Sequence, residues 1–136
     1  MEKTLSDSAG AGNVNVREYW GTVQNTIQAA PHVISFEIAF EEIDNRECYI
    51  RGKLQLTGGL QLHIAEYVIT GSTLGRTKYR YHLQDADGRM LARWDNASHH
   101  QEVATFPHHR HEADGTVKDS PAMDIEAVLQ AVVAFL

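Results

Sequence analysis

Residues 79–96, YRYHLQDADGRMLARWDN, predict the architecture of this chain. Two runs of alternating side chains flank the turn-forming segment 85–88, so we expect a β-hairpin. The side chains expected on one face are Tyr79, Tyr81, Leu83, Ala92 and Trp94. Those expected on the other face are Arg80, His82, Arg93 and Asp95. Only a loop of odd length or a bulge would exchange the two faces, because a slip of one residue turns every side chain over.

The same period of two continues toward the N-terminus. Apolar and polar residues alternate at 34–40, 48–56 and 60–64, which predicts three more strands. Ile34 and Phe36 should face the core. The inward parity of the 60–64 run also includes Glu66, but we favour a bulge that turns this carboxylate to solvent over a buried base, because burying a charge is costly.

Helical periodicity occurs near both ends of the chain. Asn15 and Glu18 have the spacing of a capping box, and the stripe that follows predicts a helix over 16–29 with Trp20 buried at its centre. A second apolar stripe predicts a helix over 124–135. The fold class is therefore α+β: an antiparallel sheet of about five to six strands, with the N-terminal and C-terminal helices packed on one face.

Length and composition set the organisation. The 136 residues suit one domain, which we place at 13–136 after a disordered tail at 1–12 that is rich in Ser, Gly, Ala and Asp. Cys48 is the only cysteine, so no disulfide can form within the chain. Neither a secretory signal nor an apolar run of membrane-spanning length is present, so we expect a cytoplasmic protein that does not interact with a membrane.

The charge is unevenly distributed. The net charge of −6 argues against a general nucleic-acid-binding protein. Residues 76–111, however, contain six Lys or Arg, four acidic residues and six histidines. This local excess of cations can bind one anionic substrate, or it can be the scatter of charges on amphipathic strands, and the sequence leaves both interpretations open.

The segment that follows the hairpin is unusually rich in histidine. Residues 94–111, WDNASHHQEVATFPHHRH, contain five of the eight histidines and show no persistent apolar period. A long irregular connection in a compact domain is usually functional or disordered. Val103, Ala104 and Phe106 can anchor it, so we expect an ordered functional loop.

Histidines beside cations are suited to the cleavage of RNA. An imidazole can remove the proton from the 2′-OH or protonate the leaving 5′ oxygen near neutral pH, while a guanidinium stabilises the phosphorane charge. Neighbouring cations would lower the pKa of one histidine and make it a base, whereas Asp95 would keep another as a proton donor. As catalytic residues we expect His99, His109, His111, Arg110 and Asp95. As substrate-binding residues we expect Arg80, His82, Arg93, Asn96 and His108.

Two other interpretations of the histidines remain. This acid–base chemistry needs no cofactor, but the same loop could bind zinc or another divalent ion and act as a metal-dependent hydrolase or nuclease, although the spacings match no established zinc pattern. The simplest interpretation is structural: each histidine forms hydrogen bonds with the backbone and caps a loop.

The hairpin at 79–96, the pair His99-His100 and the ending FPHHRH at 106–111 together resemble the TumE-type toxins of prokaryotic toxin–antitoxin modules. Ser98 stands where that family's motif has proline, and Arg110 where lysine is common. The resemblance implies an α+β toxin that inhibits growth and is neutralised by a cognate antitoxin, typically a helix-turn-helix DNA-binding protein. RNA is the expected substrate, and a non-catalytic toxin that blocks a cellular target is the alternative. The sequence leaves a homodimer open.

Overall fold

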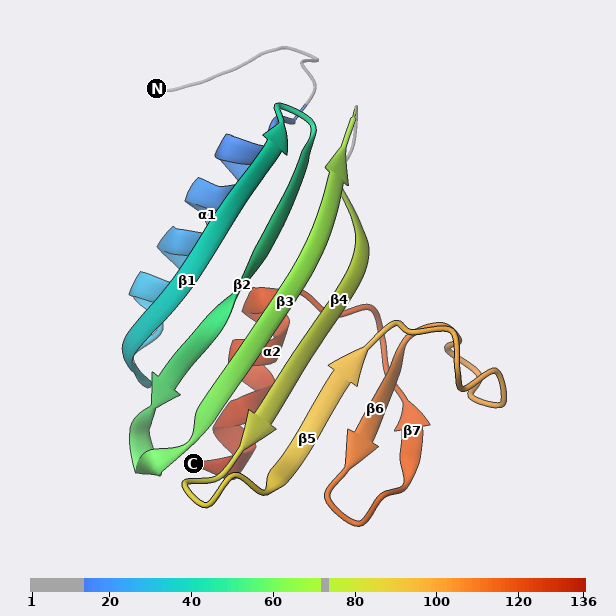
Figure 1. The fold of residues 1–136 in the computed structure, drawn as a ribbon. Coiled ribbons are helices and arrows are strands. Elements are labelled where there is room, and N and C mark those ends of the chain that lie inside the picture. The colour runs from blue at the N-terminus through green and yellow to red at the C-terminus, as the bar shows by residue number, and fades with distance from the viewer. Residues whose placement is uncertain (1–13, 72–73) are drawn as a thin grey trace.

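The structure is a computed structural model that describes residues 14–71 and 74–136. One antiparallel sheet contains seven strands in the order β1 to β7, so each strand pairs with the next one in the chain (Figure 1). The helices are α1 (Val16–Ala29) and α2 (Ile125–Ala131), and α2 continues into a 3₁₀ turn at Val132–Phe135. The strands are β1 (Val33–Asp44), β2 (Glu47–Leu56), β3 (Gln61–Thr70), β4 (Leu74–Gln84), β5 (Met90–Asp95), β6 (His109–Glu112) and β7 (Val117–Asp119). The α+β prediction is confirmed, with more strands than the five to six expected.

Both helices lie on the same face of the sheet, behind it in Figure 1. We call this the covered face and the opposite one the open face. Asn15 and Glu18 form the predicted capping box, and the Asp124 side chain caps α2 by accepting a hydrogen bond from the Ala127 N–H. The expected tail at 1–12 lies outside the described residues. No helix in the described part of the chain is long and apolar enough to cross a membrane.

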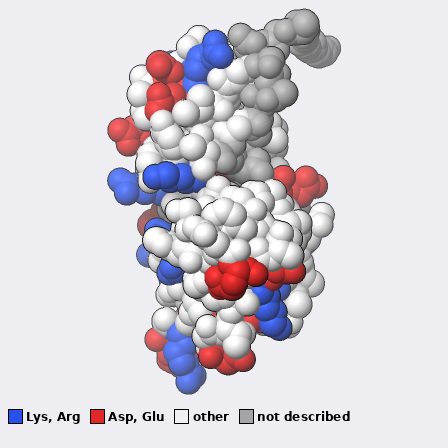
Figure 2. Space-filling view, turned by 90° about the vertical axis from the view of Figure 1, so that its right-hand side faces the viewer, with Lys and Arg blue, Asp and Glu red and all other residues white. Residues whose placement is uncertain are grey.

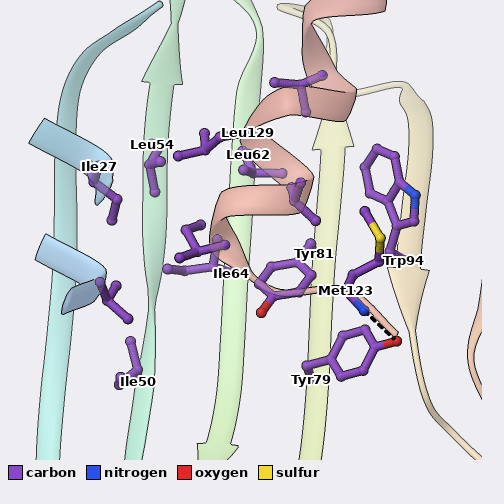
Figure 3. Close-up of a cluster of buried hydrophobic side chains, with 14 of the residues drawn as sticks. Ile27, Ile50, Leu54, Leu62, Ile64, Tyr79, Tyr81, Trp94, Met123 and Leu129 are labelled. Atoms are coloured by element: carbon purple, nitrogen blue, oxygen red, sulfur yellow. Dashed lines mark hydrogen bonds between the residues drawn. The ribbon is translucent and has the colours of Figure 1, made fainter. Parts of the chain in front are cut away.

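The core lies between the helices and the covered face (Figure 3). The side chains assigned to one face of the 79–96 hairpin are all buried there: Tyr79, Tyr81, Leu83, Ala92 and Trp94. Pairing of His82 with Arg93 fixes this register. Trp20, expected at the centre of the helical stripe, is only half-buried and stacks on Phe40 with 5.3 Å between ring centroids. Its neighbour Tyr19 takes the buried position instead.

Glu66 is buried under α1, so the expected solvent-facing bulge is wrong. Only 1% of the residue is exposed. Its carboxylate accepts hydrogen bonds from the hydroxyls of Tyr19 on α1 and Tyr81 on β4. These two partners lie far from Glu66 in sequence, and they satisfy the buried charge that made solvent exposure the favoured interpretation.

The edge strand β1 also departs from expectation. Ile34 is 64% exposed and Phe36 is 39% exposed, although both were predicted to face the core. An irregularity between Val33 and Ser35 takes Ile34 out of the alternation. Phe36 keeps the parity of the covered face, since it pairs with the buried Leu54, but it lies on the outermost strand, where no second neighbouring strand covers it.

The extra strand, β6, arises within the histidine-rich segment. His109–Glu112 pairs with β5 on one side and β7 on the other, so the expected loop is shorter than 94–111. The prediction missed this strand because His-Arg-His-Glu has no apolar member to show the period of two. The connection that remains, 96–108, leaves and rejoins the sheet between two neighbouring strands (Figure 1).

Candidate active site

Strand register brings the polar residues of β4, β5 and β6 together on the open face. Arg80 pairs with Asp95, which pairs with His109. In the next row of this face, Arg93 lies between His82 and His111. Two guanidinium groups, a carboxylate and imidazoles therefore alternate across three neighbouring strands.

Asp95 holds two of the histidines. Its carboxylate lies 2.8 Å from Nε2 of His109 and 3.3 Å from Nε2 of His111, and these two nitrogens are 3.2 Å apart. The carboxylate also accepts a hydrogen bond from the Ala97 N–H at 3.0 Å. Asp95 is 6% exposed and His109 is 1% exposed. The two ring nitrogens and the carboxylate therefore form a tight, largely dehydrated cluster.

The outer nitrogens of this cluster are also bonded. Nδ1 of His109 donates to the carbonyl of Pro107 at 2.9 Å, because a carbonyl can only accept. Its Nε2 then faces the carboxylate of Asp95, and two acceptors would oppose each other unless a second proton or a cation lies between them. Nδ1 of His100 is fixed in the same way by Glu102, at 3.1 Å. Both rings thus present Nε2 to the cluster.

The electrostatic surroundings of His111 favour its neutral form. The pKa of His111 is lowered chiefly by burial, and His109, His100 and Arg93 lower it further, against the opposing effect of Asp95. The pKa of His82 is lowered by burial and by Arg93. Nδ1 of His82 accepts a hydrogen bond from Nε of Arg93 at 3.1 Å, which orients this guanidinium beside His111.

The cluster forms one end of a pocket of about 660 Å³. The charged and histidine side chains that line it are Lys78, Arg80, Arg93, Asp95, His99, His100, His109 and His111. Tyr49 and Tyr67 line it as well, so the pocket extends along the sheet from β6 to β2. Among the described residues that line it, three are cations and one, Asp95, is an acid.

Hydrogen bonds and one buried side chain fix the 96–108 connection, which covers part of this pocket. The Asn96 side chain accepts from the Tyr79 N–H and donates to the Thr77 carbonyl. Val103 is buried, and Thr105 accepts a hydrogen bond from the Ser120 N–H. These contacts agree with the prediction that the loop is ordered. Phe106, an expected anchor, is 41% exposed.

The same cluster has the ligands for a metal ion. His100, His109 and His111 each offer one ligand atom, and these atoms lie within 4.8 Å of one another. Three imidazoles with a water molecule are a ligand set that zinc accepts, and an outer hydrogen bond to a carbonyl or carboxylate is typical of ligating histidine. The arrangement can therefore bind either protons or a divalent cation.

Comparison with protein families identifies the chain. The family model described as Toxin TumE matches residues 23–136. The chain belongs to the TumE toxin family. No curated protein and no solved structure matches it significantly. The matched region of this TumE-family chain includes all seven strands, α2 and every residue of the pocket, and membership implies an antitoxin partner.

Seven of the ten site residues predicted for this TumE-family toxin line the pocket. They are Arg80, Arg93, Asp95, Asn96, His99, His109 and His111. Arg110 lies on the covered face, because side chains alternate along β6 and those of His109 and His111 point to the open face. Its guanidinium lies over the ring of Trp94, 5.2 Å from the centroid, and pairs with Glu112. Arg80 and Arg93 are left as the cations beside the histidines.

The other two predicted residues support the site from outside. His82 orients Arg93, as described above. His108 stacks on Tyr79, with 5.8 Å between ring centroids, and its Nδ1 is 2.8 Å from the Tyr79 hydroxyl. These contacts hold the chain just before His109, so His108 contributes to the position of the loop.

The pocket residues that sequence reasoning did not assign to the site include His100, Lys78, Tyr49 and Tyr67. The pair His99-His100 contained the signal for the first, but nothing in the sequence says which of two adjacent histidines turns inward. The tyrosines alternate outward on strands distant from the histidines. Only the pairing of β2, β3 and β4 brings them to the same pocket.

Proposed function

We propose that this chain inhibits growth by cleaving RNA in the open-face pocket, with histidines as acid and base and without a metal ion. The observation that carries the proposal is the cluster of Asp95, His109 and His111 beside two guanidinium groups. Membership of a toxin family supplies the biological setting.

The cluster suggests a separate role for each histidine. His111, whose lowered pKa favours the neutral ring, removes the proton from the 2′-OH of the substrate. The 2′ oxygen attacks the adjacent phosphorus and the bond to the 5′ oxygen breaks. His109 gives its Nε2 proton to that leaving oxygen. The products are a 2′,3′-cyclic phosphate and a free 5′-OH.

The remaining groups act on charge and position. Arg80 and Arg93 stabilise the negative charge that develops on the phosphorane. Asp95 holds both imidazoles in place. His99, which is exposed at the pocket wall, and Asn96 are in a position to contact the substrate. The partner is a cognate antitoxin of the helix-turn-helix DNA-binding class.

The test uses matched histidine variants. His109→Gln and His111→Gln should abolish growth inhibition on inducible expression and slow RNA cleavage by the purified protein at least about 100-fold, the usual contribution of a general acid or base. His63→Gln is the control, since His63 lies on the same face but outside the pocket. Thermal melting should show that all three variants fold. Growth inhibition that persists in both pocket variants would favour the non-catalytic, target-blocking toxin.

A metal-dependent hydrolase is the second candidate, because three imidazoles converge at one point. Metal analysis of the purified protein and assays with EDTA separate the two mechanisms. Full activity in EDTA is expected for proton transfer by histidine. Activity lost in EDTA and restored by zinc would establish the metal-dependent mechanism instead.

A further inference from the structure

We propose that the open face is a path for single-stranded RNA, which runs from the histidine cluster across β4 and β3 to a stacking platform formed by Tyr67 and Tyr49. The choice of RNA rests on the proposed function. The path itself rests on the shape, charge and aromatic side chains of the face.

The path is continuous because the strands pair in order. Asp95, Arg80, Ala65 and Arg51 occupy one row across β5, β4, β3 and β2. Tyr67 and Tyr49 lie opposite each other in the adjoining part of the same face. Both tyrosines and the histidines line a single pocket, so no side chain divides the two ends.

Ala65 gives this pocket its floor. Its methyl group lies between the two long side chains of Arg51 and Arg80 in the row. A larger residue at this point would fill the hollow between the histidine end and the tyrosine end. Ala39 occupies the same row on β1, beyond Arg51, and does not line the pocket.

The tyrosines are arranged to receive a base. Their ring centroids are 5.9 Å apart with 39° between the planes, so an inclined pair of rings borders the pocket. The hydroxyl of Tyr67 donates to Glu47, which orients its ring. The guanidinium of Arg51 lies 5.5 Å from the centroid of Tyr49. Aromatic rings beside cations are the usual means by which proteins bind single strands without reading sequence.

The charge of the path suits a phosphate backbone. Lys78, Arg80 and Arg93 line the pocket, where Asp95 is the only acid among the described lining residues, although the whole chain has a net charge of −6. Figure 2 views the sheet from its β7 side, with the open face edge-on at the left, and shows several Lys and Arg side chains along that edge with Asp and Glu side chains above them. Glu47, which accepts from the Tyr67 hydroxyl, and Glu41, opposite Tyr49 on β1, lie beyond the tyrosines on this face. The phosphates should therefore follow the three cations between the tyrosines and the histidine cluster.

The dimensions set the minimum substrate. The path crosses from β6 to β2, four strand spacings, or roughly 19 Å at ~4.8 Å each. A dinucleotide bound at the histidines cannot also reach the tyrosines. An oligonucleotide can occupy both ends, so the platform should contribute only to longer substrates.

The experiment measures binding and cleavage separately. Binding uses fluorescence anisotropy with an RNA octamer that is 2′-O-methylated throughout, which the protein cannot cleave because no 2′-OH is free. Tyr67→Ala should weaken octamer affinity about 5- to 150-fold, the range for one stacked base. Tyr67→Phe, which keeps the ring, should bind like the wild type. Ala65→Leu should weaken binding, and Ala39→Leu, its matched control, should not.

Cleavage then tests the length of the path. Tyr67→Ala should lower kcat/KM for an unmodified octamer and leave that for a dinucleotide unchanged. Equal losses on both substrates, or octamer affinity unchanged in both Tyr67→Ala and Ala65→Leu, would overturn the path. A DNA octamer that binds when the RNA does not would overturn the assignment to RNA. Wild-type protein that binds the octamer through Tyr67 but cleaves no RNA would support the path and refute the proposed cleavage.

Discussion

Two buried carboxylates on opposite faces of the sheet, Glu66 and Asp95, have different partners. Glu66 lies under α1 and accepts hydrogen bonds from the hydroxyls of two tyrosines. Asp95 lies on the open face and contacts two histidines. A phenol ordinarily loses its proton far above neutral pH, whereas imidazole titrates near it. The second arrangement can therefore exchange protons near neutral pH.

The difference shows how one set of alternating strands serves two purposes. Helices exclude water from the covered face, where polar groups must be permanently satisfied. Neither helix of the described residues lies over the open face, so cations and titratable rings can remain next to solvent and to a substrate. Stability should therefore depend mainly on the first face and activity on the second, and the following variants test that division.

The largest difference in stability is expected between variants of two neighbouring residues of β5, Trp94 and Arg93. Trp94→Ala should lower the free energy of unfolding by about 3–5 kcal/mol, because a fully buried aromatic ring is removed. Arg93→Gln, one residue away on the open face, should change it by less than about 0.5 kcal/mol yet slow RNA cleavage. Urea unfolding followed by circular dichroism measures both. Similar losses of stability in the two variants would contradict the division of faces.

Replacing the Glu66 or the Asp95 carboxylate by an amide should affect different properties, stability in the first case and RNA cleavage in the second. Glu66→Gln weakens two hydrogen bonds to a buried charge and should cost about 1.5–3 kcal/mol of stability with cleavage unchanged. Asp95→Asn weakens the contacts that hold His109 and His111 in place and should slow cleavage at least about 100-fold. Unfolding curves and single-turnover cleavage rates provide the comparison. Cleavage lost in Glu66→Gln would show that the covered face also sets the geometry of the site.

The pH dependence of stability should come from the open face. The pKa values of His63, His82 and His111 are lowered from 6.5 by burial and nearby cations. A histidine with a lowered folded pKa stabilises the protein above its unfolded pKa, and this contribution is lost as pH falls through the folded value. The free energy of unfolding should therefore decline as pH falls below about 6.5.

Urea unfolding between pH 8 and pH 5 measures this decline. His63→Gln and His82→Gln should each make it shallower, because each removes one of the titrating rings. A steeper decline in either histidine variant would reverse the assigned direction.

The smallest effect should come from the exposed end of β1. Ile34→Thr should change stability by less than about 0.5 kcal/mol, since 64% of Ile34 is exposed. Ile50→Thr is the matched change at a fully buried position of β2 and should be clearly more costly. Equal effects would indicate that Ile34 becomes buried, for example against an antitoxin or a second copy of the chain.

Alternation in the sequence was enough to assign the faces of the 79–96 hairpin, since a wrong register would have placed every apolar side chain in water. The start of α1 after Asn15 was also predictable from sequence, because a capping box depends only on residues that are close together in the chain. Seven of the ten expected site residues reach the pocket because they follow from this hairpin and its immediate extension.

The tertiary structure decided what depends on partners distant in sequence. Glu66 could be buried only because Tyr19 and Tyr81 meet it from other elements. His109–Glu112 became a strand because β5 and β7 supply hydrogen bonds to a segment without an apolar pattern, and that strand sent Arg110 to the covered face. Tyr49 and Tyr67 joined the histidines through the successive strand pairings from β2 to β6. Sequence determined the local period and caps, whereas pairing between strands determined which side chains share a site.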